Sequence, residues 1–168
     1  MATCDSRAVK YDPNIHHRRS IRLTEYDYTT AGYYFVTICT HEREIVLDNP
    51  STLAVVEETW SALPERFPSV ELDEFVVMPN HIHGIVILRS QRGPKLGKVI
   101  RAFKSISAIA GNRALDRGQR PFWQRDYYER VIRSETELLA VRQYIRENPL
   151  AWDVDPENPH VVAGSGCG

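Results

Sequence analysis

The sequence is poor in the features that stabilise small secreted proteins or anchor membrane proteins. It has three cysteines in 168 residues, Cys4, Cys39 and Cys167, whose scattered spacing matches neither a disulfide framework nor a metal-binding pair. No apolar run approaches the roughly 18 residues of a membrane-spanning helix. Residues 1–10 carry charges where a secretory signal would be apolar. We therefore expect a reduced, cytoplasmic protein with no membrane partner, and the length predicts one domain.

A large excess of charge of one sign is also absent, because 21 Lys and Arg are balanced by 22 Asp and Glu. These charges are unevenly distributed along the chain. Residues 42–88 contain two basic and nine acidic side chains, whereas residues 89–132 contain eleven basic and three acidic ones. A nearly neutral domain can present one basic face, and a polyanion responds to that face rather than to the net charge. The distribution therefore favours a nucleic-acid partner.

Hydrophobic periodicity predicts an α+β domain. Strands are expected at 33–40, 70–78, 81–88 and 122–132, and helices at 50–63, 99–110 and 134–147, the second ending at Gly111-Asn112. The order βαββαβ followed by a further C-terminal helix is ferredoxin-like. It predicts a central antiparallel sheet with helices on one face and the other face free. We expect an N-terminal basic arm at 1–30, the folded domain at 31–152 and a flexible tail at 153–168.

The triplet His81-Ile82-His83 lies in one of the expected strands. Side chains alternate along a strand, so both imidazoles leave on one face, about 6–7 Å apart, and Ile82 points to the core. Two such imidazoles can chelate one divalent cation. An equally common interpretation of this triplet is two histidines on a strand face that neither bind a metal nor take part in catalysis. Cupins and amidohydrolases also use this triplet, so it does not by itself choose a reaction.

The last expected helix carries Tyr144 and Asn148, which are neighbours on one helix face. They lie along one edge of the apolar stripe and can reach across to the sheet. A tyrosine at the rim of the core and an asparagine near a helix end are the alternative reading. Tyr127 and Tyr128, on opposite faces of the last strand, are rival reactive phenols, and Glu147 is a rival ligand.

Three segments combine these residues in a fixed order: Met78-Pro79-Asn80-His81-Ile82-His83-Gly84, Trp123-Gln124-x-x-Tyr127-Tyr128 and Tyr144-Ile145-x-x-Asn148-Pro149. Together they resemble the single-tyrosine HUH transposases of the IS200/IS605 type, and most closely the REP-associated tyrosine transposases of bacteria. The resemblance runs from about residue 16 to residue 152. The stretch His16-His17-Arg18-Arg19-Ser20-Ile21-Arg22-Leu23 also resembles the entry segment of the REP-associated group.

The resemblance implies that His81, His83 and Asn148 hold a divalent metal, Mg²⁺ or Mn²⁺, and that Tyr144 on the C-terminal helix is the nucleophile. It implies a metal-dependent endonuclease and strand transferase that cuts and rejoins single-stranded or hairpin DNA through a 5′-phosphotyrosine. Such an enzyme would act at the nucleoid, in the bacterial cytoplasm. Whether it is a monomer or a homodimer stays open.

Two other functions are compatible with the sequence. A non-catalytic DNA-hairpin-binding protein would retain the fold but would need none of the four site residues. An unrelated metal hydrolase would need further carboxylate or histidine ligands, for which His41 is a candidate.

The residues expected to bind DNA are basic and lie in three parts of the sequence: the N-terminal arm, the helix at 99–110 with its approach, and the last strand. Arginine forks suit phosphate and guanine, so we expect the arm to contribute to the choice of DNA. The predicted contacts are Arg18, Arg19, Arg22, Lys98, Arg101, Lys104 and Arg125.

Overall fold

The computed structural model describes residues 31–155 and 158–159. The predicted arm at 1–30 and most of the predicted tail lie outside the described residues. The elements follow in the order β1 (Gly32–Cys39), η1 (His41–Arg43), α2 (Pro50–Ser61), α3 (Leu63–Arg66), β2 (Val70–Met78), β3 (His81–Leu88), α4 (Leu96–Ala114), β4 (Tyr128–Ile132), α5 (Glu135–Glu147) and η2 (Asn148–Val154). No helix in this part of the chain is long and apolar enough to cross a membrane.

The four strands form one antiparallel sheet in the order β2-β3-β1-β4. Sequence order βαββαβ with this spatial order is the ferredoxin-like arrangement, so the predicted fold class is confirmed. The central strands are β1 and β3, and their register pairs Thr37 with His83 and Cys39 with His81. The histidine triplet therefore lies in the middle of the sheet rather than at an edge.

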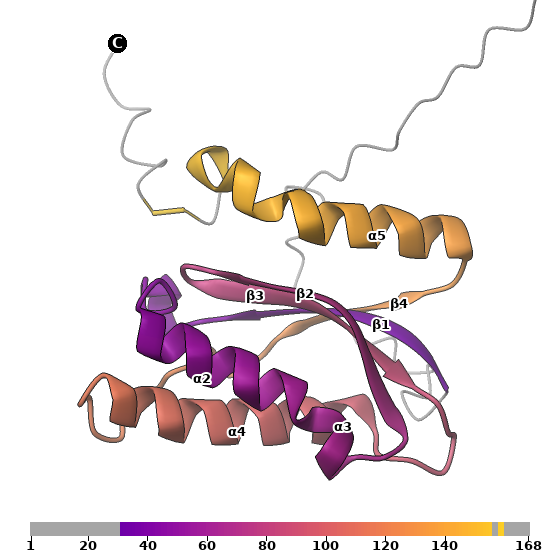
Figure 1. Cartoon of the computed structure of the whole chain (residues 1–168), viewed down its shortest axis with the longest axis horizontal. Coiled ribbons are helices and arrows are strands. Elements are labelled where there is room, and N and C mark those ends of the chain that lie inside the picture. The colour runs from indigo at the N-terminus through magenta and orange to yellow at the C-terminus, as the bar shows by residue number, and fades with distance from the viewer. Residues whose placement is uncertain (1–30, 156–157, 160–168) are drawn as a thin grey trace, which may run out of the picture.

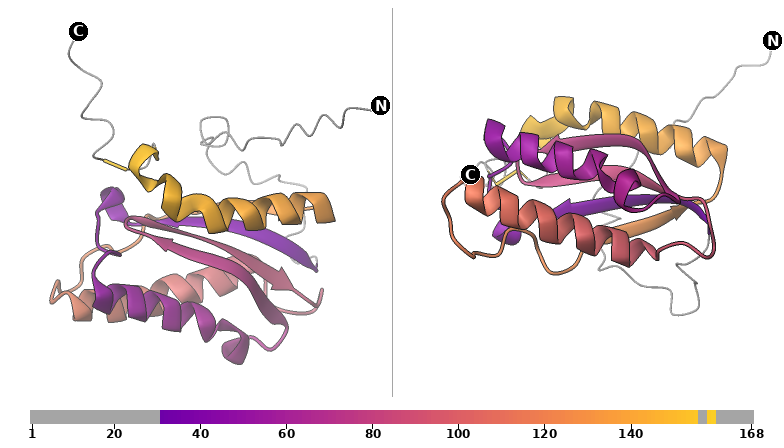
Figure 2. Two further views of the ribbon diagram at one scale, coloured as in Figure 1. Left: turned by 45° about the horizontal axis from the view of Figure 1, so that its top comes forward. Right: turned by 60° about the horizontal axis from the view of Figure 1, so that its bottom comes forward.

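The sheet has helices on both faces, which corrects the expectation of one free face. Helices α2 and α4 cover one face and α5 crosses the other (Figure 1), and two further views show the same three layers (Figure 2). The apolar stripe of α5 explains this placement, because Val141 and Ile145 bury themselves against Phe35 and Ile85 of the sheet. A second, larger core lies between the sheet and the helices α2 and α4.

The helix expected to stop at Gly111-Asn112 continues to Ala114. Gly111 is an internal packing position rather than a helix end, since a Cβ atom there would lie 2.6 Å from the ring of Phe122. The last strand is also shorter than expected. Regular pairing begins at Tyr128, and Trp123 makes only an isolated bridge with Thr40.

The two described glycines of the sheet allow a matched test of packing on the α2 face. A Cβ atom on Gly84 would lie 2.4 Å from the Trp60 ring, whereas one on Gly32 would meet only a Tyr34 carbon at 3.8 Å. We expect Gly84→Ala to lower the free energy of unfolding by about 1–3 kcal/mol through overpacking. Gly32→Ala should lower it by less than about 0.5 kcal/mol. Urea denaturation of both variants measures the difference, and equal midpoints would contradict the expected clash.

Candidate active site

His81 and His83 converge beneath α5. Both extend from β3 toward the α5 face. Ile82 between them is fully buried in the larger core, which lies between the sheet and the helices α2 and α4. The exposed fractions of the two histidines are 1% and 4%. Their Nε2 atoms lie 3.1 Å apart. The predicted facing of this strand is confirmed, and the two ring nitrogens are close enough to act on a single atom.

Each imidazole is fixed by its other nitrogen. His81 donates from Nδ1 to Oδ1 of Asn80 at 2.8 Å, and Nδ1 of His83 lies 2.8 Å from Oγ1 of Thr37. Partners of this kind set ring orientation and tautomer. Sequence reasoning missed both as site residues. Asn80 directly precedes His81, so its position was a usable signal, whereas Thr37 is placed only by the register of β1 against β3.

Thr37, His83 and His81 form a chain of hydrogen-bond contacts in which the His83 ring is uncharged. Burial, and then the nearby charge of His81, hold the pKa of His83 well below its ordinary value, so this ring is neutral at neutral pH. The Thr37 hydroxyl can donate to Nδ1 of a neutral His83, and Nε2–H of His83 then points at Nε2 of His81. Because the Thr37 hydroxyl can also accept, turning it leaves both Nε2 lone pairs available to a cation.

Tyr144 reaches the histidine pair from α5. Its hydroxyl lies 3.4 Å from Nε2 of His83. The Tyr144 ring packs edge-on against His83 and Phe35, with ring centroids 5.2 and 6.1 Å apart. Apolar packing thus holds the ring while the phenol oxygen faces the nitrogen where the two histidines converge.

Asn148 follows one turn later and has a buried oxygen without a partner. The residue is 4% exposed, and its Oδ1 accepts no hydrogen bond from the described part of the protein. Its backbone is still helical, so its side chain lies on the Tyr144 side of α5. Four residues on, Trp152 lies against His81, with ring centroids 6.2 Å apart. Asn148 therefore lies in the sequence midway between a residue that contacts His83 and one that contacts His81.

These residues fit a divalent cation. Two nitrogens about 2.1 Å from one ion and at right angles to each other would be about 3.0 Å apart, close to the observed 3.1 Å. A buried amide oxygen without a partner costs free energy unless something binds it. In residues 31–155 and 158–159, no group of three or more His, Cys, Asp and Glu is placed to hold a metal. Asn148, whose buried Oδ1 has no partner among the described residues, is the candidate for a third protein ligand.

The rival tyrosines lie elsewhere. Tyr127 packs on the α4 side, where its hydroxyl donates to Glu129 at 2.8 Å. Tyr128 lies on the α5 face, and burial raises its pKa. Its strand is separated from His83 by β1, because Thr37 pairs with Tyr128 on one side and with His83 on the other. The expected opposite facing of the two tyrosines is confirmed.

The structure places the other candidate ligands away from the histidine pair. Glu147 is exposed and accepts a hydrogen bond from Gln143 at 2.8 Å. His41 lies in η1, and its Nε2 is 3.8 Å from the Glu42 carboxylate.

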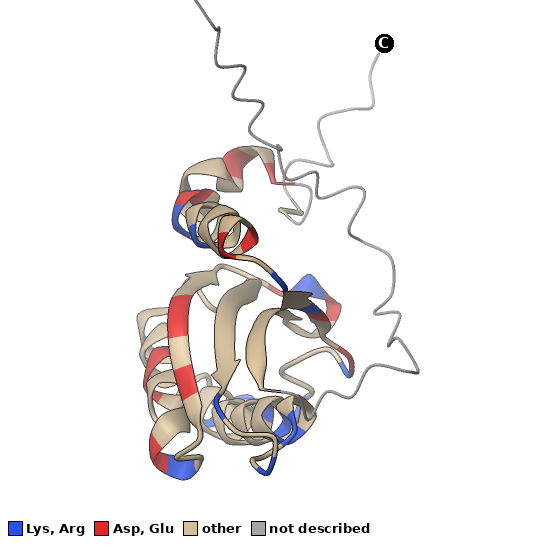
Figure 3. Cartoon of the chain, turned by 90° about the vertical axis from the view of Figure 1, so that its right-hand side faces the viewer, with Lys and Arg blue, Asp and Glu red and all other residues tan. Residues whose placement is uncertain are grey.

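The basic residues expected to bind DNA are not gathered around Tyr144. Lys98 and Arg101 are exposed on α4, which lies across the sheet from α5. The acidic residues of β2 and the basic residues of α4 are visible in Figure 3. The three arginines predicted on the arm, Arg18, Arg19 and Arg22, lie outside the described residues.

Lys104 organises a loop near the site. Its ammonium donates to the carbonyls of Gln124 and Arg125 at 2.7 and 2.8 Å, and burial lowers its pKa, with Asp126 acting in the opposite direction. Gln124 in turn donates its N–H to the Cys39 carbonyl at the end of β1, where β1 pairs with His81. Lys104 therefore anchors this loop, in which Arg125 is exposed, and its predicted contact with DNA stays a prediction.

Comparison with known proteins gives three results. The sequence model of the family described as "Transposase IS200 like" matches residues 28–148. An uncharacterised protein of Haemophilus influenzae is 36% identical, over 88% of this chain and 96% of its own length. A solved structure described as a REP-associated tyrosine transposase bound to a REP hairpin superposes with a TM-score of 0.60 at 23% identity, covering 76% of this chain and 73% of the other. This structural similarity concerns the fold.

Proposed function

This chain belongs to the IS200-like transposase family, and we propose that it is a metal-dependent nuclease and strand transferase acting on hairpin-forming single-stranded DNA. The observation that carries the proposal is the approach of the Tyr144 hydroxyl to within 3.4 Å of the buried histidine pair. The solved protein of the same fold is described with a REP hairpin. Hairpin DNA is therefore the substrate class we propose here.

In this proposal His81, His83 and Asn148 hold Mg²⁺ or Mn²⁺. Such a cation would polarise the scissile phosphate and offset its negative charge. The protein keeps both imidazoles oriented through Asn80 and Thr37. The low pKa of His83 keeps it neutral, as a metal ligand must be.

Tyr144 supplies the nucleophile. Its phenol oxygen forms a bond to phosphorus while the bond from phosphorus to the 3′ oxygen breaks. The phenol loses its proton, and the departing 3′ oxygen gains one. The phosphate stays on the 5′ carbon, joined to Tyr144. Attack by a 3′-OH on the phosphotyrosine reverses the step, so rejoining needs no nucleotide cofactor.

The structural details favour catalysis over simple hairpin binding. A DNA-binding surface gains nothing from two buried imidazoles and a buried amide oxygen without a partner, which all cost desolvation free energy. A hydrolase with an additional carboxylate or histidine ligand is disfavoured, since the described residues offer no such group. Tyr144 and the histidines come from one chain, so a monomer has all four proposed residues.

The DNA would extend beyond the reacting phosphate. Arg125 is exposed next to Gln124, whose N–H bonds to the end of β1 that pairs with His81, while Lys98 and Arg101 are exposed on α4. Each phosphate contact adds to the salt dependence of binding, by about 0.7 in the logarithmic slope for a single strand.

Covalent trapping tests this function. Hairpin DNA is labelled at either its 5′ or its 3′ end and incubated with the protein and Mn²⁺ or Mg²⁺. We expect a denaturant-resistant adduct that contains the 3′ label and releases the 5′ label, and we expect EDTA to prevent it. A scrambled strand of equal composition is the control. Hairpin binding without an adduct in either metal would instead establish a binding protein.

A further inference from the structure

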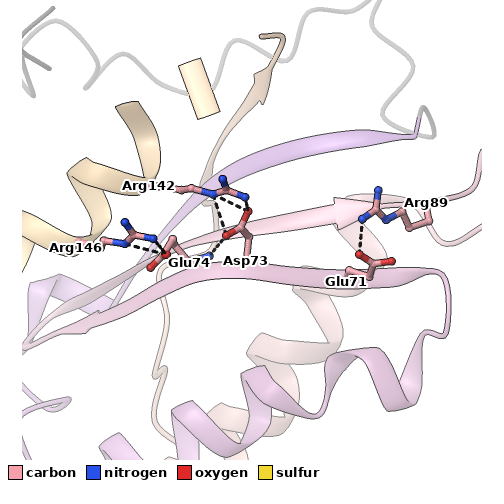
Figure 4. A network of polar contacts seen from close by, with 6 residues as sticks. All are labelled: Glu71, Asp73, Glu74, Arg89, Arg142 and Arg146. Atoms are coloured by element: carbon pink, nitrogen blue, oxygen red, sulfur yellow. Dashed lines mark hydrogen bonds and ion pairs between the residues drawn. The ribbon is translucent and has the colours of Figure 1, made fainter. Parts of the chain in front are cut away.

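Helix α5 is attached to the edge strand β2 by two arginine–carboxylate pairs (Figure 4). Arg142 donates to Asp73 from Nε at 3.0 and 3.2 Å and from Nη2 at 2.6 Å. One turn later, Arg146 donates to Glu74 from Nε at 2.9 Å and also from Nη2. We call these two ion pairs the α5 clasp. Neither pair contacts the histidines directly.

A β-bulge makes the clasp possible. The pairing of β2 with β3 shifts register between Leu72 and Phe75, so one extra residue is inserted there. In a regular strand Asp73 and Glu74 would point to opposite faces, whereas here both carboxylates reach α5. Asp73 also accepts the Glu74 N–H at 2.8 Å, which stabilises the bulge. The bulge therefore brings the Asp73 and Glu74 carboxylates to the same side of β2, where both contact α5.

The clasp and the site residues lie on opposite edges of α5. At about 100° per residue, Arg142 and Arg146 follow one side of the apolar stripe, while Tyr144 and Asn148 follow the other. Ile145, at the centre of the stripe, faces the sheet between them. A rotation of the helix about its own axis would therefore move the clasp and Tyr144 in opposite directions relative to the sheet.

Even a small rotation of α5 would displace the Tyr144 hydroxyl from its place over His83. A turn of about 10° moves a side-chain tip about 6 Å from the axis by about 1 Å. A misplacement of about 1 Å can cost about 100-fold in rate. Arg142 holds Asp73 through a planar fork that restricts orientation, and the Asp73 side chain is only 14% exposed.

We propose that the α5 clasp sets the rotation of α5 and thereby positions the Tyr144 hydroxyl over His83, with Asp73 and Arg142 as positioning residues. This inference rests on the proposed function of Tyr144. Glu74 and Arg146 contribute less, because the Arg146 side chain is 64% exposed and its ion pair is screened by solvent.

The chain contains a matched control for this proposal. Glu71 lies on the same strand and pairs with Arg89 at 2.5 Å, without contacting α5. Glu71→Gln and Asp73→Asn each remove one negative charge from β2. The asparagine retains an oxygen to accept the Glu74 N–H. Any effect of net charge on DNA binding is therefore the same in both variants.

The rate of adduct formation at saturating hairpin DNA is the first measurement. Asp73→Asn and Arg142→Ala should lower this rate about 10-fold or more, with hairpin affinity within about twofold of the unsubstituted protein. Arg142→Lys retains the charge but loses the fork, so its rate should fall between those of Arg142→Ala and the unsubstituted protein. Glu71→Gln should leave the rate within about twofold. The proposal would be overturned if Asp73→Asn and Arg142→Ala lowered hairpin affinity but not the rate of adduct formation. Equal rates for Asp73→Asn and Glu71→Gln would also overturn it.

A second measurement needs neither DNA nor metal. With 3-fluorotyrosine incorporated, the ¹⁹F resonance of Tyr144 is assigned by its disappearance in Tyr144→Phe. Asp73→Asn should shift this resonance and Glu71→Gln should not. An unchanged resonance in Asp73→Asn overturns the clasp. If the unsubstituted protein forms no adduct but Asp73→Asn still shifts the Tyr144 resonance, the proposed function is refuted. The proposed positioning of Tyr144 by the clasp is then still supported.

Discussion

We expect Tyr144→Phe to abolish formation of the covalent DNA adduct and to leave hairpin affinity within about twofold. The reason is that the hydroxyl carries the proposed chemistry, whereas the ring carries the packing against Phe35 and His83. The 3.4 Å approach to His83 is long for a hydrogen bond, so removing it should change the free energy of unfolding by less than about 1 kcal/mol. Adduct trapping, hairpin titration and urea denaturation measure the three effects.

Tyr128→Phe is the control for this substitution. Tyr128 shares the α5 face of the sheet, and it packs edge-on against the same Phe35 ring at 6.2 Å. It lies two strands away from His83, so its hydroxyl should be dispensable for adduct formation. If Tyr144→Phe still forms the adduct and Tyr128→Phe does not, Tyr128 is the nucleophile and the proposed role of α5 is wrong.

Local periodicity was sufficient to predict much of the candidate site. The alternation of side chains along a strand placed His81 and His83 together and Ile82 in the opposite core. The helical period placed Tyr144 and Asn148 on one side of α5. Both relations depend only on residues within one element, and for that reason a single sequence contains them.

Contacts between distant elements could not be predicted in this way. Thr37 contacts His83 only because of the register of β1 against β3, and Asp73 contacts Arg142 only because of a bulge in β2. Gly111 was interpreted as a helix end because glycine often occupies that position, but the Phe122 ring requires its small size. In each case the deciding partner lies far away in the sequence.

The placement of α5 had the largest consequence for the site. The sequence showed an amphipathic helix after β4 but not which surface it would cover. Because α5 packs on the face opposite α2 and α4, the histidines are 1% and 4% exposed rather than open to solvent. Burial of this kind lowers the pKa of His83 and makes an unpartnered amide oxygen at Asn148 costly.

Replacing both His81 and His83 by alanine should abolish Mn²⁺ binding and adduct formation while the protein remains folded. The two side chains bring their Nε2 atoms to 3.1 Å from each other, and Asn148 alone is too weak a ligand to retain the metal. Calorimetric Mn²⁺ titration and circular dichroism test these two expectations.

Ile82→Ala is the matched control on the same strand. Its side chain is fully buried in the other core, so the substitution should lower the free energy of unfolding by about 2–5 kcal/mol yet retain metal binding in the folded fraction. Unchanged Mn²⁺ affinity in the double variant would show that the cation binds elsewhere and that the buried histidine pair has a structural role only.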